Sequence, residues 1–255
     1  MKLHKLKWSI PKDQDGDNLC AFSDSHKGNR YHDAENYKIN LNWLYKHKEY
    51  KVITLGDLIE CSTKHSVGLN DQIMSVDDQI DEIIGDFEPL AEEGRLIGMI
   101  QGNHERRALK EASVDVTKRI ANQLNVPYMG VGAVLYVKVR NANMVRGQNY
   151  VVYAVHGNSS ARTSGGRINA VMRMGNIVNA DLYLHAHLHC LDHEVQDIHE
   201  VVRGKLRLKR KHYVITGSYL TYGGYVEEKG YAPAGPSGSA RVKFHTDEHR
   251  ITVKI

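Results

Sequence analysis

Five short polar segments of this sequence carry residues that commonly bind metal ions. They are Asp24-Ser25-His26, Gly56-Asp57-Leu58-Ile59-Glu60, Gly102-Asn103-His104-Glu105, His156-Gly157 and His187-Leu188-His189. Their carboxylate, amide and imidazole groups form a mixed donor set that suits Mn, Fe, Co, Ni or Zn, whereas Ca²⁺ prefers oxygen alone. Taken together, the segments predict a hydrolytic site built around two metal ions.

Each polar segment follows a short apolar run that is typical of a buried strand. The runs cover residues 19–22, 51–55, 96–100, 150–155 and 181–184. In open α/β sheets the binding crevice lies beyond the carboxyl ends of the strands, so segments far apart in sequence can meet there. We therefore expect the five segments to converge at one end of the fold.

The stretches between these runs show helical periodicity. Apolar residues recur at helical spacing from Tyr37 to Tyr45, Ile73 to Phe87, Leu109 to Leu124 and Ile168 to Val178. After Pro127, runs at 134–139 and 150–155 flank an Asn-rich turn at 141–149, which indicates adjacent strands and a second sheet. The last predicted elements are a Gly-, Pro- and Ser-rich excursion at 227–239 and strands at 241–245 and 251–255.

The composition is that of an ordinary globular protein. The chain has 255 residues, 41% hydrophobic and 25% charged, which predicts a single domain spanning residues 1–255. No apolar run approaches the length of a membrane span. The basic N-terminal segment lacks a following apolar stretch, so we expect no secretory signal and a cytoplasmic location. The net charge of +4 permits an anionic substrate without requiring one.

The three cysteines predict neither a disulfide framework nor a zinc site. Cys20, Cys61 and Cys190 are few and scattered, and no CxxC pair is present. Cys190 follows His189 and would bias the site toward Zn if it were a thiolate ligand. We favour a packing role, which is more common for a single cysteine beside a ligand.

In their order, the five segments resemble the pattern of the calcineurin-like metallophosphoesterase superfamily, which is DxH, GDxx, GNH(E/D), a lone His and GHxH. The match runs from Asp24 to His189, about two thirds of the chain. The resemblance implies a four-layer α/β/β/α sandwich and metal-dependent hydrolysis of a phosphoester. No single motif of the five has this specificity.

The resemblance also implies a role for each residue. It assigns Asp24, His26 and His189 to one metal, Asn103, His156 and His187 to the other, and Asp57 to both. Two cations roughly 3.5–4 Å apart can share a hydroxide and clamp the attacking and leaving oxygens. His104 is then no ligand, and its imidazole can assist the leaving group. Mn is the expected metal, and Fe, Zn, Ni or Co would also fit.

One position departs from the superfamily pattern and leaves the register of the last motif open. The glycine of GHxH is Ala186 here, and His185 precedes it. On an extended backbone His185, His187 and His189 would all face one side. We choose His187 and His189 as ligands, because the predicted strand ends at Leu184, and we treat His185 as a neighbour of the site.

Several cationic residues are candidates for substrate binding. The loop 158–166 runs into a predicted helix, whose N-terminus attracts anions, and Arg162 and Arg167 would add charge-assisted contacts to phosphate. An ordinary flexible loop with a helix cap is the alternative. This loop is also similar to loops of phage and prophage members of the superfamily, which would place a phage-encoded protein in the host cytoplasm.

Other polar residues near the motifs receive weaker predictions. We expect Arg106 and Arg107 to be solvated, as arginines in a first helical turn commonly are. Asn29, Arg30, Tyr31 and His32 are candidates for the rim of the site. Glu60 is expected to contact a ligand rather than the metal itself.

The strongest basic run, at 203–211, offers a second surface for anions. A hairpin about Gly204 would turn Leu206 and Leu208 inward and Arg207 and Lys209 outward, forming a stripe for a phosphate backbone. A solvated strand face is the competing interpretation.

We therefore expect a phosphodiesterase or nuclease acting on nucleic acid or nucleotides, with no membrane partner. The alternatives are a phosphomonoesterase acting on a protein or small molecule, and a scaffold that binds nucleic acid without cleaving it. The sequence leaves the oligomeric state open.

Overall fold

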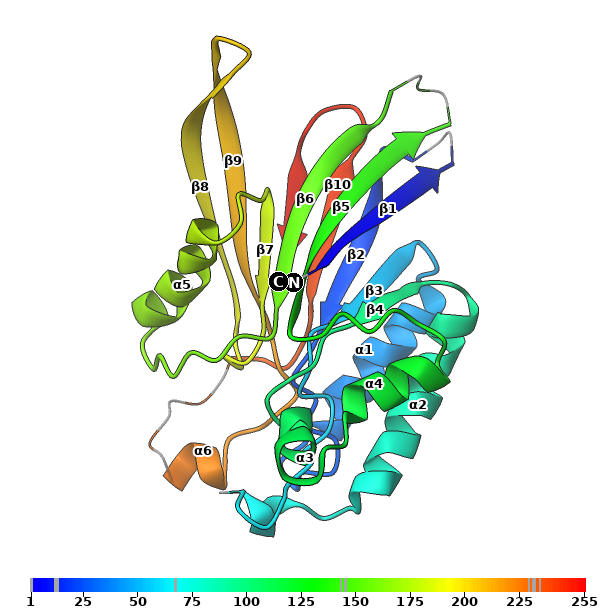
Figure 1. Ribbon diagram of the computed structural model, residues 1–255, viewed down its shortest axis with the longest axis vertical. Helices are drawn as coiled ribbons and strands as arrows, with labels where there is room; N and C mark the ends of the chain where they lie inside the picture. Colours follow the sequence, from blue (N-terminus) through cyan, green and yellow to red (C-terminus); the bar gives the residue numbers. More distant parts are fainter. Residues whose placement is uncertain are drawn as a thin grey trace.

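The computed structural model describes residues 2–11, 14–66, 68–142, 144, 146–228, 230, 233 and 235–255. Within them, two β-sheets pack face to face and helices cover both outer sides (Figure 1). This arrangement confirms the expected four-layer α/β/β/α sandwich. The predicted turn at 141–149 and the excursion at 227–239 lie partly outside the described residues.

The first sheet contains the strands that precede Asp24, Asp57 and Asn103. Its strands are β2 (Gly16–Phe22), β3 (Tyr50–Thr54), β4 (Leu96–Met99), β10 (Ala240–His245) and β11 (Ile251–Lys254). The spatial order is β11-β10-β2-β3-β4, with β2, β3 and β4 parallel and β10 antiparallel to both of its neighbours. The three buried strands and the final strand pair expected here are confirmed.

The second sheet contains the strands that precede His156 and His187. Its strands are β1 (Lys2–Ile10), β5 (Gly132–Asn141), β6 (Gln148–Val155), β7 (Leu182–His185), β8 (Leu191–Val202) and β9 (Lys205–Thr216). The order is β1-β5-β6-β7-β9-β8, and β5 and β6 form the predicted antiparallel pair. Strand β1 was not predicted. It lies at the edge and carries Lys2, Lys5 and Lys7, and such lysines protect an edge from further pairing.

Three apolar clusters define the layers. Leu19, Ile53, Leu135, Val152 and other buried residues fill the space between the sheets. The helices are α1 (Ala34–Lys46), α2 (Val76–Glu92), α3 (Glu105–Ala112), α4 (Val116–Gln123), α5 (Ser164–Met172) and α6 (Tyr225–Glu228), with short 3₁₀ turns at Leu69–Asp71 and Arg173–Asn176. Helices α1, α2 and α4 cover the first sheet, and α5 covers the second. Among the described residues, no helix combines the length and apolarity needed to cross a membrane.

The helical stretch predicted from Leu109 to Leu124 is two helices rather than one. Ser113 ends α3 in the left-handed conformation (φ 58°), and the Asp115 side chain caps α4 by accepting the N–H of Lys118. A Ser and an Asp in such positions compete with helical hydrogen bonding, so they stop a helix even when the apolar spacing continues. Ile73 likewise lies before α2, which Ser75 caps, and is 66% exposed.

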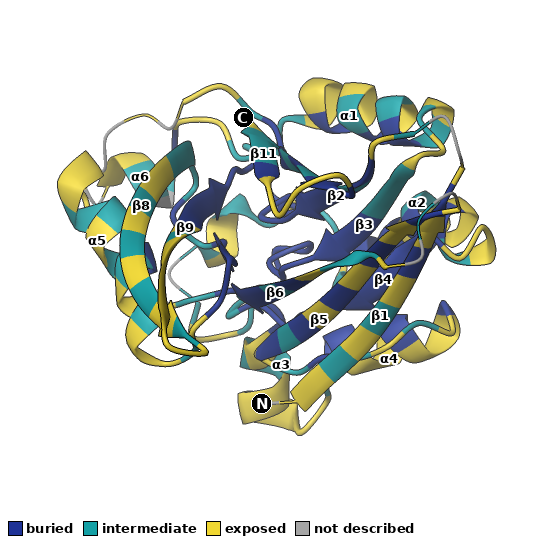
Figure 2. Cartoon of the chain, turned by 90° about the horizontal axis from the view of Figure 1, so that it is seen from above, coloured by how far each residue is buried: buried dark blue, intermediate teal, exposed yellow. Residues whose placement is uncertain are grey.

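Strands β8 and β9 form the predicted hairpin about Gly204, but the prediction for its two faces was wrong. The hairpin protrudes from the sandwich, and exposed residues run along it (Figures 1 and 2). Leu206 and Leu208 are 67% and 61% exposed, because no layer covers their face. On the other face, Lys209 Nζ lies 3.1 Å from Asp181 of the body. The predicted alternation of residues between the two faces of the strand is confirmed, but the prediction that Leu206 and Leu208 face inward was wrong.

Candidate metal centre

The five polar segments meet beyond the carboxyl ends of β2, β3, β4, β6 and β7. Each candidate ligand lies within four residues of the end of its strand. Because these strands belong to two packed sheets, the loops that follow them bring residues from 24 to 189 into one cluster. The predicted convergence is therefore present in the structure.

The backbone of this cluster is strained. Among the described residues, nine other than glycine have positive φ, and five of those are candidate ligands, namely Asp24 (50°), His26 (47°), Asp57 (49°), His187 (67°) and His189 (50°). This conformation costs a side-chain-bearing residue about 1–3 kcal/mol, and it persists only where the surrounding structure enforces it. The strain also breaks the alternation that would have turned His185, His187 and His189 to one side.

Two glycines let the loops after β3 and β4 touch through their backbones. A Cβ on Gly56, which has φ of +88°, would lie 2.2 Å from the Gly102 nitrogen, and a Cβ on Gly102 would lie 2.1 Å from the Asp57 nitrogen. Such distances are far below any real contact, so both positions require glycine. The Gly-Asp and Gly-Asn motifs thus fix where Asp57 and Asn103 lie.

Glu105 ties the same two loops together, a role that the sequence analysis did not assign. Its buried carboxylate accepts the backbone N–H groups of Asp57 (3.1 Å), Leu58 (2.7 Å) and Gly102 (3.0 Å). Hydrogen bonds to a buried carboxylate are stronger than neutral ones, so Glu105 holds the bridging position rigidly. Its place at the end of the Gly-Asn-His-Glu segment was the available signal.

The candidate ligands form two groups that share Asp57. Ligand atoms of Asp24, His26, Asp57 and His189 all lie within 4.8 Å of one another, and so do those of Asp57, His156 and His187. Asn103 joins the second group, with Oδ1 2.8 Å from His156 Nε2. The two groups match the division between two metals that the resemblance implies.

Hydrogen bonds outside the cluster orient two of the imidazoles. His156 Nδ1 lies 2.7 Å from the Leu55 carbonyl oxygen, and His26 Nδ1 lies 3.2 Å from Glu60 Oε2. An Nδ1–H donated outward leaves the Nε2 lone pair directed into the cluster, as metal-binding histidines commonly have it. Glu60 therefore contacts a candidate ligand, as expected.

The donor atoms fit a cation better than they fit each other. His26 Nε2 and His189 Nε2 face one another at 3.2 Å, so one of the two rings must carry its proton there unless a cation lies between them. His187 Nδ1 is buried without a hydrogen-bond partner, and the buried Asp57 Oδ2 faces His156 Nε2 at 3.1 Å. Buried polar atoms usually have partners, and metal coordination would supply them here.

Electrostatics in the cluster also favour positive charge. Burial opposes ionisation of Asp57, but the imidazoles of His156 and His104 hold the pKa of Asp57 well below its usual range. Burial opposes charge on His156, yet the Asp57 carboxylate raises the pKa of His156 to about 10. In both cases an anion at the centre of the cluster attracts a cation.

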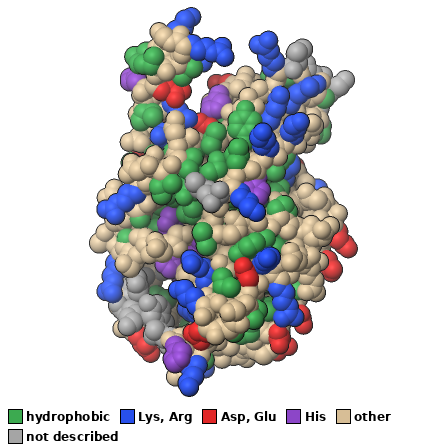
Figure 3. Space-filling view, in the orientation of Figure 1, with side chains coloured by type: hydrophobic (Ala, Val, Ile, Leu, Met, Phe, Trp, Pro, Cys, Tyr) green, Lys and Arg blue, Asp and Glu red, His purple; other side chains and the backbone are tan. Residues whose placement is uncertain are grey.

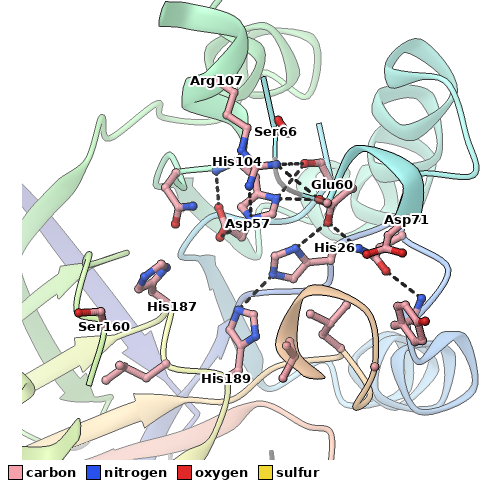
Figure 4. A pocket seen from close by; sticks show the side chains of 18 of the residues that line it. His26, Asp57, Glu60, Ser66, Asp71, His104, Arg107, Ser160, His187 and His189 are labelled. Atoms are coloured by element: carbon pink, nitrogen blue, oxygen red, sulfur yellow. Dashed lines mark hydrogen bonds and ion pairs between the residues drawn. The ribbon is translucent and has the colours of Figure 1, made fainter. Parts of the chain in front are cut away.

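His104 is outside both groups that share Asp57, and its imidazole belongs to a third group of possible ligand atoms with His26 and Glu60. Its backbone N–H donates to Asp57 Oδ1 at 2.8 Å, its Nδ1 lies 2.8 Å from the Glu60 carbonyl oxygen, and its Nε2 lies 3.9 Å from Asp57 Oδ2. Arg107 was expected to be solvated, but its Nη2 lies 2.9 Å from His104 Nε2 (Figure 4). Arg106, which is exposed, follows the prediction. The helical turn of α3 returns residue 107, and not residue 106, to the side of residue 104.

A cavity of about 460 Å³ opens above the cluster. Its floor includes His26, Asp57, Asn103, His104, His187 and His189, and its walls come from described residues within 63–66, 68–71, 159–167, 220–223 and 226. Asp71 and Ser160 lie on opposite sides of the row formed by His26, His187 and His189 (Figure 4). Arg162 and Arg167 line the wall contributed by the start of α5, where Thr163 caps the helix.

The remaining candidates lie at the edge of the cluster or outside it. His185 is buried against Gly157 and belongs to neither metal group of the described residues, which agrees with the chosen register. Cys190 is also outside both groups, and its thiol interacts with Arg167. Of the rim candidates, Asn29 and Tyr31 line the cavity.

Comparisons with known proteins find distant structural similarity alone. No family model matches this chain, and no curated protein matches it. The structure is similar to Vps29 from Cryptosporidium parvum, with 13% identity and a TM-score of 0.42 over 94% of this chain and 97% of that one. It is also similar to a predicted phosphoesterase from Streptococcus pneumoniae, with 12% identity and a TM-score of 0.37 over 90% of this chain and 84% of that one.

Zinc-bound Vps29 from Entamoeba histolytica is a further similar structure, with 12% identity and a TM-score of 0.35 over 93% of this chain and 97% of that one. At these TM-scores we base the interpretation of the site on its own geometry. The four layers, the strand-end loops and the paired His and Asp groups are those that the resemblance to calcineurin-like metallophosphoesterases implies.

Proposed function

We propose that this protein is a dimetal-dependent phosphoester hydrolase. One observation carries the proposal: two groups of buried and half-buried His and Asp donors share a single carboxylate, Asp57, at the floor of a cavity. A shared carboxylate holds two cations close enough to act on one phosphorus atom. A purely structural metal site would have no need of a second ion or of a cavity above it.

The division of roles follows from the positions of the donors. Asp24, His26 and His189 would hold one ion, Asn103, His156 and His187 the other, and Asp57 would bridge them. When bound, the two ions supply Lewis acidity and an activated water for attack on phosphorus. His104, held by Asp57 and Glu60, has its imidazole beside this point and would assist departure of the leaving alkoxide. Mn²⁺ is our first choice of metal.

The cavity supports a phosphodiester of nucleotide size as the substrate. Its volume of about 460 Å³ is within the range of small-molecule sites. A diester has substituents on both sides of the phosphorus, and the cavity extends on both sides of the histidine row, toward Asp71 and toward Ser160 (Figure 4). Arg162 and Arg167 would bind further phosphate oxygens at the start of α5. The basic hairpin points away from this cavity, so it gives no support to a polymeric substrate.

The decisive experiment is a comparison of substrates with Mn²⁺-loaded protein. It uses a chromogenic phosphodiester, the matching monoester, a set of nucleotide diesters, and labelled single- and double-stranded DNA and RNA. We expect turnover of the chromogenic diester and of at least one nucleotide diester. Zn²⁺, Co²⁺, Ni²⁺ and Fe²⁺ loading of the same preparation identifies the most active metal.

The other outcomes separate the rival functions. Hydrolysis of the monoester alone would identify a phosphomonoesterase and exclude the diester proposal. Cleavage of the polymers at a higher rate than the nucleotides would identify a nuclease. If metal analysis finds two ions per chain but none of these substrates turns over, the protein is a metal-stabilised scaffold.

A further inference from the structure

Arg107 makes contacts that an arginine on a solvated helix face would not make. Its Nη2 lies 2.9 Å from His104 Nε2, and its Nη1 lies 3.2 Å from the Glu60 carbonyl oxygen and 3.4 Å from Glu60 Oε1. Its side chain is 25% exposed and lines the cavity above the candidate metal ligands. In Figure 4, Arg107 extends from α3 toward His104 and Glu60.

These contacts occupy some of the N–H donors of the Arg107 guanidinium and leave its other N–H donors without a partner among these residues. Arginine has five N–H donors in a fixed plane, of which Nη1 contributes two, Nη2 two and Nε one. Nη1 and one N–H of Nη2 face Glu60 and His104. The donors that remain are Nε–H and the second N–H of Nη2, which point in the same direction. That pair matches the spacing of two oxygens of a phosphate or carboxylate.

The carboxylate of Glu60 does not depend on Arg107 for its hydrogen bonds. The two carboxylate oxygens of Glu60 already have closer partners, namely His26 (3.2 Å) and Asn29 (3.0 Å) at Oε2 and Ser62 (3.1 Å) at Oε1. The contacts of Arg107 Nη1 and His104 Nδ1 with Oε1, both 3.4 Å, are the longest of this set. Arg107 thus lines the cavity with a short contact to His104 and longer ones to Glu60, and its remaining donors are available to a ligand there.

The geometry points to Arg107 as a substrate-binding residue that takes two phosphoryl oxygens with Nε–H and Nη2–H. This inference rests on the proposed function, because it assumes a phosphoester at the same site. Its ligand class is an anionic phosphoryl group, whichever ester carries it. His104 and Glu60 then act as positioning residues for Arg107, and His104 Nε2 serves the leaving group once Nη2 has turned from it to the phosphoryl oxygens.

The test measures binding of inorganic phosphate to the Mn²⁺-loaded protein by isothermal titration calorimetry. We expect Arg107→Ala to weaken phosphate binding by about 10- to 100-fold, as loss of a bidentate charge-assisted contact does. Arg106→Ala is the matched control, because Arg106 is the next residue on α3 and is exposed. Its phosphate affinity should equal that of the unmodified protein. Metal content is measured for every variant.

Three further measurements keep the result interpretable. Arg107→Lys retains the charge beside Glu60, so it guards against loss of metal in the alanine variant, and we expect it to weaken binding at least several-fold because lysine has no fork. Added guanidinium should restore part of the phosphate affinity of Arg107→Ala but not that of Arg107→Lys. In the diester assay, KM should rise in both variants.

The inference and the proposed function can fail separately. If metal-loaded Arg107→Ala turns over the diester with unchanged phosphate affinity and unchanged KM, the inference is wrong and the proposed function stands. Absence of phosphate binding by the unmodified loaded protein would overturn it as well. If phosphate binds through Arg107 but no ester is hydrolysed, the inference stands and the proposed hydrolase activity does not.

Discussion

The two ends of this sandwich differ in which side chains they bury: one end buries polar side chains, and the other exposes apolar ones. At the carboxyl ends of β2, β3, β4, β6 and β7, carboxylates and imidazoles are buried and the backbone is strained. At the far end, the β8–β9 hairpin keeps regular strand geometry and exposes Val201, Leu206 and Leu208. Figure 3 shows Lys and Arg side chains gathered at its tip.

This difference indicates where the structure is tightly specified. Each buried donor and each left-handed residue in the cluster costs free energy that neighbouring contacts must offset. The structure around a substitution in the cluster therefore has few ways to relax. The outer part of the hairpin is mostly exposed, apart from the contact of Lys209 with Asp181, so substitutions at its exposed residues change few contacts. We therefore expect the effects of substitutions to fall steeply from the cluster to the hairpin, and the following predictions test that gradient.

The largest effect is expected from Asp57, which is common to both groups of donors. Asp57→Ala should remove metal from the protein and lower hydrolysis by about 10⁴-fold or more, because both ions lose a ligand and the charge that holds them together. Metal content by mass spectrometry and diester turnover measure this. Asp57→Asn preserves shape and should also lose metal. A fully loaded, active Asp57→Ala variant would contradict the shared-carboxylate assignment.

His104 should separate catalysis from metal binding. His104→Ala is expected to retain two metal ions per chain and to lose about 10²- to 10⁴-fold in kcat, the range for removing a general acid. Its own contacts are with Asp57, Glu60 and Arg107, and it belongs to neither of the two groups that share Asp57, although a third possible group joins it to His26 and Glu60. If the variant instead binds no metal, His104 is a ligand and its proposed role is wrong.

A matched pair of glycines compares backbone constraint at the two ends. Gly56→Ala should destabilise the protein by about 3 kcal/mol or more, because its Cβ would overlap the Gly102 backbone in addition to the cost of positive φ. Gly204→Ala in the hairpin turn has φ of +73° and open space around it, so it should cost about 1 kcal/mol. Urea unfolding of both variants measures the difference in their free energies of unfolding. Equal midpoints would show that the backbone is no more constrained at Gly56 than at Gly204.

The smallest effect is expected on the apolar face of the hairpin. Leu206→Ser and Leu208→Ser should each change the free energy of unfolding by no more than about 0.5 kcal/mol, because both side chains are already exposed in the folded chain. Leu135→Ser, between the sheets, is the control and should cost several kcal/mol by burying a hydroxyl and leaving a cavity (about 2–5). A large loss from either hairpin variant would mean that this face is covered in solution.

The sequence was sufficient to predict most of the strands and the donor set. Buried parallel strands have apolar runs of a characteristic length, and the polar segments after them stand out against such runs. The break between α3 and α4 was harder to recognise in the sequence, because the apolar spacing of a helix continues through Ser113 and Asp115, where the helix ends and a new one begins. Strand β1 was missed because its lysines interrupt the apolar pattern of an edge strand.

By itself, the sequence determined which donors are present and in what order, because ligand chemistry belongs to the residue types. The tertiary structure alone decided their geometry. Left-handed backbone at Asp24, Asp57 and His187 depends on contacts from other loops, so no local pattern could indicate it. The same holds for Arg107, whose side chain reaches His104 only because α3 starts directly after His104. Exposure of Leu206 and Leu208 likewise depends on whether another layer covers the hairpin, and the sequence of a strand does not contain that information.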